Sequence, residues 1–534
     1  MNVYTTDKIR NVVLLGHSGA GKTSLVESMA YLAGVTSRMG KVEDGNTISD
    51  FGKEEQKRQI SISTSVVPIE WNGTKINILD TPGYFDFIGE VEEAISAADA
   101  AIILVSGKAG VEAGTERAWE LCEKYKLPRM IYVTGMDADN ASFKNVVETL
   151  TMMYGKKIAP FHFPIRENEK FVGYINVISE NASRWQGKEV VDCEVPDYSK
   201  ENLTLYKDTL MEAVAETSEE FMDRYFSGDT FSENEIRSAL RMNIIDGSIV
   251  PITMGSNTLC QGTYALLDDI VKYMPSPENK EIAGFNMKTN EVFLANYDFS
   301  KAKSAYVFKT IVDPFIGKYS LIKVCSGVFK SDDVIYNKDK DIEEKVSKLY
   351  VLQGSKPIEV PELHAGDIGA IAKLTAARTG NTLSTKANII EYGKFEISKP
   401  YTAMRYKVPN KSNIDKVAQA LQKLTHEDQT LKVVNDAENR QTLLYGIGEQ
   451  QLEIIQSRLL SEYKCEIELS KPKIAFRETI KKKADVEYKY KKQSGGHVTG
   501  VEPEPMFPDS LSSTPIINKK SQLSYPLTFS QQKL

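Results

Sequence analysis

The chain has 534 residues, which is too long for a single hydrophobic core and predicts roughly three to four domains of about 100–200 residues each. Its 41% hydrophobic and 26% charged residues are typical of a globular protein, and the net charge of −7 argues against a uniformly basic nucleic-acid-binding surface. The apolar runs are shorter than a membrane span, the start lacks a signal-peptide core, and the five cysteines show no metal-ligand spacing. A reducing cytoplasm is therefore the expected setting.

A strand, a glycine-rich loop and a helix are predicted in the sequence NVVLLGHSGAGKTSLVESMAYLAG. The loop fits the pattern Gly-x-x-x-x-Gly-Lys-Thr, in which backbone N–H groups surround phosphate oxygens at the N-terminus of a helix. Lys22 is expected to reach the β- and γ-phosphates, and the Thr23 hydroxyl is expected to ligate Mg²⁺. The predicted phosphate loop consists of Gly16, His17, Ser18, Gly19, Ala20, Gly21, Lys22 and Thr23. We expect the His17 side chain to point away from the phosphates.

Two later segments are candidates for nucleotide-sensing switches. Residues 45–63, GNTISDFGKEEQKRQISIS, are polar and irregular before they alternate as a strand would, and Ser61 can offer a hydroxyl to Mg²⁺. The strand INIL ends in Asp80, Thr81, Pro82 and Gly83, where the aspartate would hold a Mg²⁺-bound water and the Gly83 N–H would face the γ-phosphate. Tyr84 follows, at the place where a water-positioning group is expected.

Further buried strands are predicted in AAIILVSGKAGV, PRMIYVTGMD and VPITMGSN. Asp137 closes the second of these at its carboxyl end, which is where ligands bind in open α/β sheets. The predicted fold class is therefore α/β, with a phosphate-loop domain over residues 1–275. Residues 155–250 interrupt it as a charged, helix-rich insertion. We expect a solvated acidic face there, with a surface for a basic partner as the alternative.

Composition changes mark the later domains. Prolines and polar residues predict a linker at 276–302, and short alternating runs punctuated by Gly and Asp predict an antiparallel β-barrel at 303–388. Residues 389–475 predict a ferredoxin-like α+β domain, in which Ile414, Val417, Leu421 and Leu424 share one helix face, and Leu452, Ile455 and Leu459 share another. The tail at 499–534 shows no periodicity and is predicted to be disordered.

Long stretches of the chain resemble elongation factor G, and above all the elongation factor G-like translational GTPases. The resemblance rests on MGKVEDGNTISDFGKEEQKRQISI, on the segment after the second switch, on AYVFKTIVDPFIGKYSLIKVCSGVFKSDD, and on ALQKLTHEDQTLKV with LLYGIGEQQLEIIQSRLLSEY. It stops after Gly496, so residues 476–498 resemble only the opening of a fourth domain and the chain is interpreted as truncated there. We expect either a reading-frame shift, a premature gene end or a lineage-specific tail.

The resemblance also identifies departures from the family. An aspartate of the family loop is Gly19, the Mg²⁺-binding threonine of the first switch is Ser61, and the histidine of the second switch is Tyr84. The resemblance implies two base-reading segments, of which the first keeps only its aspartate and the second ends in asparagine: Thr134, Gly135, Met136 and Asp137, then Gly255, Ser256 and Asn257. We expect Asp137 to bind guanine, the Asn257 N–H to meet guanine O6, and GTP affinity to fall by roughly 1–3 kcal/mol.

The resemblance implies a cytoplasmic, GTP- and Mg²⁺-binding translation factor that docks on the ribosome, is monomeric away from it, and has no membrane partner. Lys22, Gly83 and Tyr84 are the expected catalytic residues. A phenol stays neutral at pH 7 and is a poor proton acceptor, so weak hydrolysis is expected. Two alternatives remain: a GTP-sensing ribosome-binding protein that does not hydrolyse its nucleotide, and the remnant of a ribosomal-protection-type factor.

Overall fold

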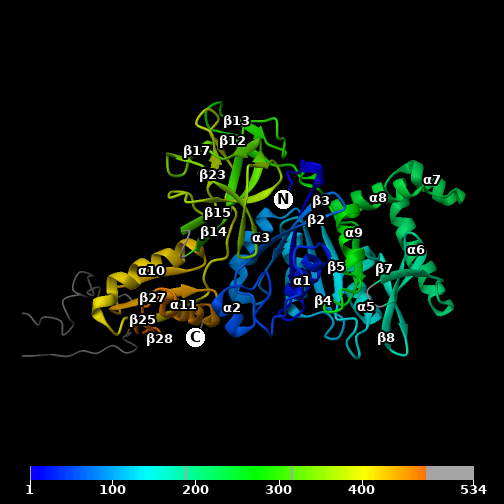
Figure 1. Cartoon of the computed structure of the whole chain (residues 1–534), viewed down its shortest axis with the longest axis horizontal. Helices are drawn as coiled ribbons and strands as arrows, with labels where there is room; N and C mark the ends of the chain where they lie inside the picture. Colours follow the sequence, from blue (N-terminus) through cyan, green and yellow to red (C-terminus); the bar gives the residue numbers. More distant parts are fainter. Residues whose placement is uncertain (1, 187–188, 314–316, 477–534) are drawn as a thin grey trace, which may run out of the picture. The chain divides into compact units, whose positions relative to one another are not determined.

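The computed structural model of the protein describes residues 2–186, 189–313 and 317–476. Its N-terminal part contains a seven-stranded sheet in the order β2-β3-β1-β4-β5-β11-β6 (Figure 1). Every neighbouring pair is parallel except β2 and β3, so the fold class predicted from the sequence is confirmed. The strands are β1 (Ile9–Gly16), β2 (Ser65–Trp71), β3 (Thr74–Asp80), β4 (Ala100–Ser106), β5 (Arg129–Thr134), β6 (Ile158–Pro160) and β11 (Val250–Met254).

Helices cover this sheet. Helix α1 (Lys22–Leu32) follows the phosphate loop as predicted and contacts α9 (Thr263–Tyr273), whereas α3 (Ile88–Ala97) and α4 (Ala113–Lys124) contact β1. The others in this part are α2 (Lys53–Arg58), α5 (Phe143–Tyr154) and the 3₁₀ turns η1 (Thr6–Lys8), η2 (Phe85–Phe87), η3 (Gly155–Lys157) and η5 (Pro277–Asn279). Within the described ranges, no helix is both long and apolar enough to cross a membrane.

The strand register brings the predicted functional loops to one edge of the sheet. Leu14 of β1 pairs with Asp80 of β3, and Val133 of β5 pairs with Met254 of β11. Because these strands are parallel, the loops that follow them emerge at the same carboxyl edge. The strands themselves are buried apolar runs, and residues 12–15 are at most 2% exposed, as a central parallel strand requires.

The insertion contains more β structure than the sequence predicted. Four antiparallel strands, in the order β10-β9-β8-β7, precede three helices. The prediction of a helix-rich insertion is therefore incomplete, because the short strands alternate only weakly in polarity. The elements are β7 (His162–Glu167), β8 (Lys170–Asn176), β9 (Asn181–Gln186), β10 (Glu189–Cys193), η4 (Asp197–Ser199), α6 (Lys200–Ala215), α7 (Glu219–Ser227) and α8 (Glu233–Asp246).

The predicted linker at 276–302 is partly folded. Strands β12 (Ala283–Asn286) and β13 (Glu291–Leu294) form a hairpin, and β12 also pairs with β24 (Ile390–Glu391). The antiparallel eight-stranded sheet that follows has the order β18-β17-β23-β14-β15-β22-β19-β20. Its strands, with the separate pair β16 and β21, are β14 (Ser304–Asp313), β15 (Gly317–Ser326), β16 (Val328–Lys330), β17 (Val334–Asn337), β18 (Ile342–Lys345), β19 (Leu349–Gln353), β20 (Lys356–Val360), β21 (Glu362–His364), β22 (Ile368–Ala372) and β23 (Thr382–Ser384).

Buried ion pairs join the β-rich part to the first domain. Lys323 Nζ lies 2.8 Å from Asp99 Oδ2, and neither side chain is more than 1% exposed. The same carboxylate oxygen accepts a hydrogen bond of 2.6 Å from Asn11 Nδ2. Lys309 Nζ contacts the Glu90 carboxylate on α3, and these side chains are 4% and 12% exposed. Such pairs are costly to break, because each partner would be left as a buried charge.

The last described part has the order strand, helix, strand, strand, helix, strand, as the predicted ferredoxin-like domain requires. Its four-stranded sheet runs β26-β27-β25-β28, and the elements are β25 (Thr402–Lys407), η6 (Lys411–Asn413), α10 (Ile414–Glu427), β26 (Lys432–Asp436), β27 (Gln441–Gly446), α11 (Glu449–Ser461) and β28 (Glu468–Ser470). The predicted apolar faces are buried except at Ile414, which is 50% exposed because it lies at the first position of α10. The predicted tail and nearly all of the fourth-domain segment lie outside the described residues.

Candidate functional site

The loop between β1 and α1 holds a buried lysine at its centre. Lys22 Nζ donates hydrogen bonds of 2.9 Å to the carbonyls of Gly16 and His17, and its side chain is only 6% exposed. Burial lowers the pKa of Lys22, while the carboxylates of Asp80 and Asp50 act in the opposite direction. The loop thus holds a cation where stronger acceptors than carbonyls, such as phosphate oxygens, can be bound.

The three predicted metal ligands lie together. Thr23 Oγ1 is 3.0 Å from Asp80 Oδ2, to which it donates, and 3.1 Å from Ser61 Oγ. Ser49 Oγ donates a further bond of 2.7 Å to the same Asp80 oxygen. These residues come from α1, from the first switch and from the end of β3, so three separate segments meet at this point.

The oxygen set at this point suits a small hard cation. Asp80 Oδ1 is buried, and it has no hydrogen-bond partner within the described ranges. Burial and the neighbouring Asp50 carboxylate raise the pKa of Asp80, and burial also raises the pKa of Asp50. Two hydroxyls beside two crowded carboxylates are ligands that Mg²⁺ prefers, and a divalent cation would relieve their repulsion. The residues present therefore fit Mg²⁺.

Two buried glutamates hold the first switch in place, and the sequence analysis did not identify either. Glu27 on α1 accepts hydrogen bonds from the backbone N–H groups of Gly40 (2.6 Å) and Ile48 (2.5 Å). Glu55 on α2 accepts from three N–H groups: 2.9 Å from Gly52, and 3.0 Å from each of residues 62 and 63. The backbone N–H groups of this irregular segment therefore donate to side-chain carboxylates instead of to backbone carbonyls. These bonds hold the residues on either side of Ser61 in place.

The second switch lies against the phosphate loop. A Cβ placed on Gly83 would be 2.7 Å from Ser18 N and 2.8 Å from Lys22 Nζ, so only glycine fits this close approach. Thr81 donates its hydroxyl to the carbonyl of Leu14, which fixes the start of the switch on β1. Tyr84 is 38% exposed, and its hydroxyl has no hydrogen-bond partner among the residues that the structure describes.

A groove of about 380 Å³ runs beside this switch. Its lining includes His17, Tyr84, and Arg117 on α4, whose guanidinium lies 3.9 Å from the centre of the Phe85 ring. The His17 ring faces α4: Nδ1 accepts a hydrogen bond of 3.3 Å from a backbone N–H there, and Nε2 is 3.6 Å from the Glu112 carboxylate. The His17 ring thus has its partners at the start of α4, and Tyr84 of the second switch also lines the groove.

The segment after β5 places its residues in different environments. Thr134 Oγ1 donates a hydrogen bond of 2.8 Å to the carbonyl of Ala20, so this side chain contacts the phosphate loop. Gly135 has φ +66°, a backbone conformation that glycine adopts without strain. Met136 is fully buried in the core, whereas Asp137 is exposed and accepts a 3.4 Å contact from Thr258 Oγ1. Asp137 is thus the accessible acceptor of this segment.

The segment after β11 is bonded to the one after β5. Gly255 accepts a hydrogen bond of 3.1 Å from Met136 N and donates one of 2.9 Å to the Val133 carbonyl. Ser256 is buried, and its N–H donates to the Gln261 carbonyl at 2.7 Å. The Asn257 side chain donates to the carbonyl of Gly21 at 2.9 Å. The structure therefore brings all the predicted loops together at one edge of the sheet.

Both switches also contact helix α11. Asp86, two residues after Tyr84, accepts hydrogen bonds from the backbone N–H groups of Gln450 (3.0 Å) and Gln451 (3.4 Å) in the first turn of α11. Glu54 on α2 accepts a bond of 2.6 Å from Ser457 Oγ, two turns further along. Asp86 thus supplies the side-chain cap that Gly448, the residue before the helix, lacks.

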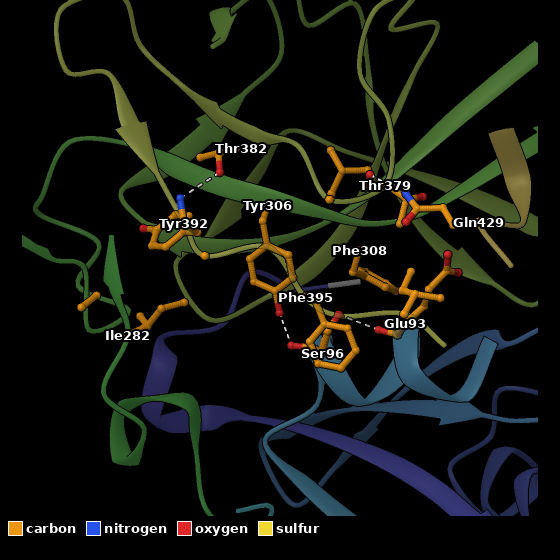
Figure 2. Close-up of a pocket in the computed structure, with 15 residues that line it drawn as sticks. Glu93, Ser96, Ile282, Tyr306, Phe308, Thr379, Thr382, Tyr392, Phe395 and Gln429 are labelled. Atoms are coloured by element: carbon orange, nitrogen blue, oxygen red, sulfur yellow. Dashed lines mark hydrogen bonds between the residues drawn. The ribbon is translucent and has the colours of Figure 1, made fainter. Parts of the chain in front are cut away.

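A separate pocket lies away from these loops. Figure 2 shows that its lining combines α3, the barrel strands and the segment after β24, and its volume is about 230 Å³. Its polar groups bond to one another: Tyr306 donates to the Ser96 carbonyl, and Gln429 Nε2 donates to the Thr379 carbonyl at 2.8 Å. Because these groups already have partners, we assign the functional site to the loops at the sheet edge.

Comparisons with known proteins agree with this architecture. Residues 7–276 match the family described as the elongation factor Tu GTP binding domain. Residues 302–386 match elongation factor G domain 2, and residues 397–471 match elongation factor G domain III. Among solved structures, the chain is similar to a protein of Thermus thermophilus, with 32% sequence identity and a TM-score of 0.80. That match covers 92% of this chain and 72% of the Thermus chain.

Proposed function

The chain belongs to the elongation factor G-like family of translational GTPases, and we propose that it binds GTP and GDP with Mg²⁺ and hydrolyses GTP slowly on the ribosome. The observation that supports this best is the meeting of Lys22, Thr23, Ser61 and Asp80 at the carboxyl edge of the sheet. The expected location is the cytoplasm.

Each part of the site has a defined task in this proposal. Lys22 exchanges its two carbonyl partners for β- and γ-phosphate oxygens, and the Gly83 N–H contacts the γ-phosphate. Thr23, Ser61 and Asp80 hold Mg²⁺, which neutralises phosphate charge when it is bound. Asp137 accepts hydrogen bonds from guanine.

Tyr84 limits the reaction in this proposal. Its hydroxyl can hold a water molecule, since a phenol donates one hydrogen bond and accepts another. It cannot take a proton readily at neutral pH, and positioned acid–base groups typically contribute roughly 10²–10⁴-fold to a rate. We therefore expect slow intrinsic hydrolysis and weak stimulation by ribosomes.

Two measurements test the proposal. Calorimetry with GDP and Mg²⁺ should detect binding to the wild type and none to Lys22→Ala, and equal affinity in both proteins would contradict it. Phosphate release should be slow with ribosomes and rise in Tyr84→His. Wild-type turnover as fast as that of a histidine-containing elongation factor G would show that the tyrosine is a competent substitute.

A GTP-sensing, ribosome-binding protein without hydrolysis is the second candidate. It is favoured by Tyr84, a partly exposed residue whose hydroxyl has no hydrogen-bond partner in the described part of the chain. The sensing groups, Thr81 and Gly83, do not depend on this side chain. Nucleotide-dependent binding to ribosomes with no phosphate release at any ribosome concentration would establish this function instead.

A further inference from the structure

Two consecutive carbonyls of the phosphate loop are held by side chains from the base-side loops. Thr134 Oγ1 donates to the Ala20 carbonyl at 2.8 Å, and Asn257 Nδ2 donates to the Gly21 carbonyl at 2.9 Å. Both side chains belong to residues that are only 5% exposed. The Gly21 carbonyl also accepts the first bond of helix α1, from Leu25 N at 2.9 Å, so Asn257 provides its second bond.

These two contacts set the direction of the loop's N–H groups. A trans peptide unit is planar, and its C=O and N–H point in opposite directions. When the carbonyls of Ala20 and Gly21 are fixed toward Thr134 and Asn257, the N–H groups of Gly21 and Lys22 are fixed on the opposite side. N–H groups at the N-terminus of a helix are the donors that bind phosphate. The side-chain contacts therefore favour the phosphate-binding conformation of the loop.

The two side chains share one support. The segments after β5 and β11 are joined by two backbone bonds, from Met136 N to the Gly255 carbonyl and from Gly255 N to the Val133 carbonyl. There is also little space between Asn257 and the loop, since a Cβ on Gly21 would lie 2.9 Å from Asn257 Nδ2. A displacement of either base-side segment must therefore move the carbonyls that orient the phosphate donors.

We propose that Asn257 and Thr134 are positioning residues that hold the phosphate loop ready for the nucleotide and couple the base-side loops to it. This inference rests on the proposed nucleotide binding and assigns a new role to the two side chains. It adds a role at the phosphate loop to a segment that the resemblance implies reads the base. The asparagine missing from the first base-reading segment is supplied, in this arrangement, by the second.

A positioning role and a base contact predict different ligand dependence. The probes are GDP and inorganic pyrophosphate, both with Mg²⁺, measured by displacement of a fluorescent GDP analogue. Removing one buried hydrogen bond should weaken binding about fivefold to tenfold. Asn257→Ala should weaken GDP and pyrophosphate by the same factor, because the loop itself is loosened. A loss confined to GDP would show a base contact, and no loss for either ligand would also overturn the proposal.

Conservative variants and a matched control separate positioning from general destabilisation. Thr134→Val should weaken both ligands, and Thr134→Ser, which keeps the hydroxyl, should restore them. Asn243 is the control, because its Nδ2 also donates to a backbone carbonyl, that of Ala213 at 2.8 Å, but within the insertion. Asn243→Ala should leave both affinities unchanged.

A nucleotide-free readout distinguishes failure of this inference from failure of the proposed function. Amide hydrogen exchange at Leu25, whose N–H donates to the Gly21 carbonyl, should be several-fold faster in Asn257→Ala than in the wild type, even without ligand. If the wild type binds no guanine nucleotide but this difference is present, the proposed function fails and the positioning contact stands. Unchanged exchange at the Leu25 amide would refute the contact itself.

Discussion

Replacing Glu55 with glutamine tests how the first switch is held. The carboxylate accepts three backbone N–H bonds, two at Oε1 and one at Oε2. Glutamine has one acceptor oxygen, so it keeps the bonds from Ile62 and Ser63 and loses the one from Gly52. Above pH 7, where the Glu55 carboxylate is ionised, hydrogen bonds to such a charged group contribute about 1.5–3 kcal/mol. The segment should therefore open roughly tenfold to hundredfold more often.

Amide hydrogen exchange measures this opening directly. In Glu55→Gln the N–H of Gly52 should exchange roughly tenfold to hundredfold faster, whereas the N–H groups of Ile62 and Ser63, which keep their acceptor beside Ser61, should change less. Glu116→Gln is the matched control, since Glu116 is an exposed residue of α4 and has the same charge. Equal exchange in the wild type and in Glu55→Gln would refute the reasoning.

The same glutamate predicts a pH dependence. Burial, with a contribution from the Asp50 carboxylate, raises the pKa of Glu55 to about 7 despite its three N–H donors. Between the ordinary carboxyl range and pH 7, the folded protein therefore binds more protons at Glu55 than the unfolded chain does. Its contribution makes the free energy of unfolding decrease as pH rises through this window. Urea denaturation should show a shallower decrease in Glu55→Gln, and an identical slope would contradict the assignment.

Three further changes have expected outcomes. Asp86→Ala removes the side-chain cap of α11 and should lower the free energy of unfolding by about 1 kcal/mol in urea denaturation. Lys323→Met leaves Asp99 buried and unpaired and should cost about 3–5 kcal/mol, whereas adding Asp99→Leu should recover much of it; an equal loss in both would contradict a buried-charge cost. Thr134→Asn combined with Gly135→Lys should tighten GTP binding, measured by calorimetry. The gain should be smaller than the new contacts alone would give, because lysine at the positive φ of position 135 costs about 1 kcal/mol.

The parts of the site that could be predicted are those encoded by residues close together in the sequence. The phosphate loop and the Asp80–Gly83 segment are short patterns whose chemistry depends on neighbours in the chain. The meeting of Thr23 and Asp80 followed from parallel strands that share a carboxyl edge, whereas Ser61 lies before β2, which is antiparallel to β3.

Long-range contacts explain which parts were not predictable. Glutamate is common in surface helices, so the sequence does not single out Glu55. Only the fold shows that its carboxylate accepts backbone hydrogen bonds from both sides of the switch. The contact between Thr134 and the Ala20 carbonyl joins residues 114 positions apart, and no local pattern encodes it. In α10, the period correctly predicted three buried residues, but it could not show that Ile414 lies at the exposed first turn.

The attachment of α11 to both switches has a consequence for how firmly the helix is held. Asp86 and Glu54 bind the same rigid helix two turns apart, so while one contact is intact the other re-forms at high effective concentration. Loss of either contact alone therefore leaves α11 held to the other switch segment, and the two contacts together hold it more firmly than either would alone.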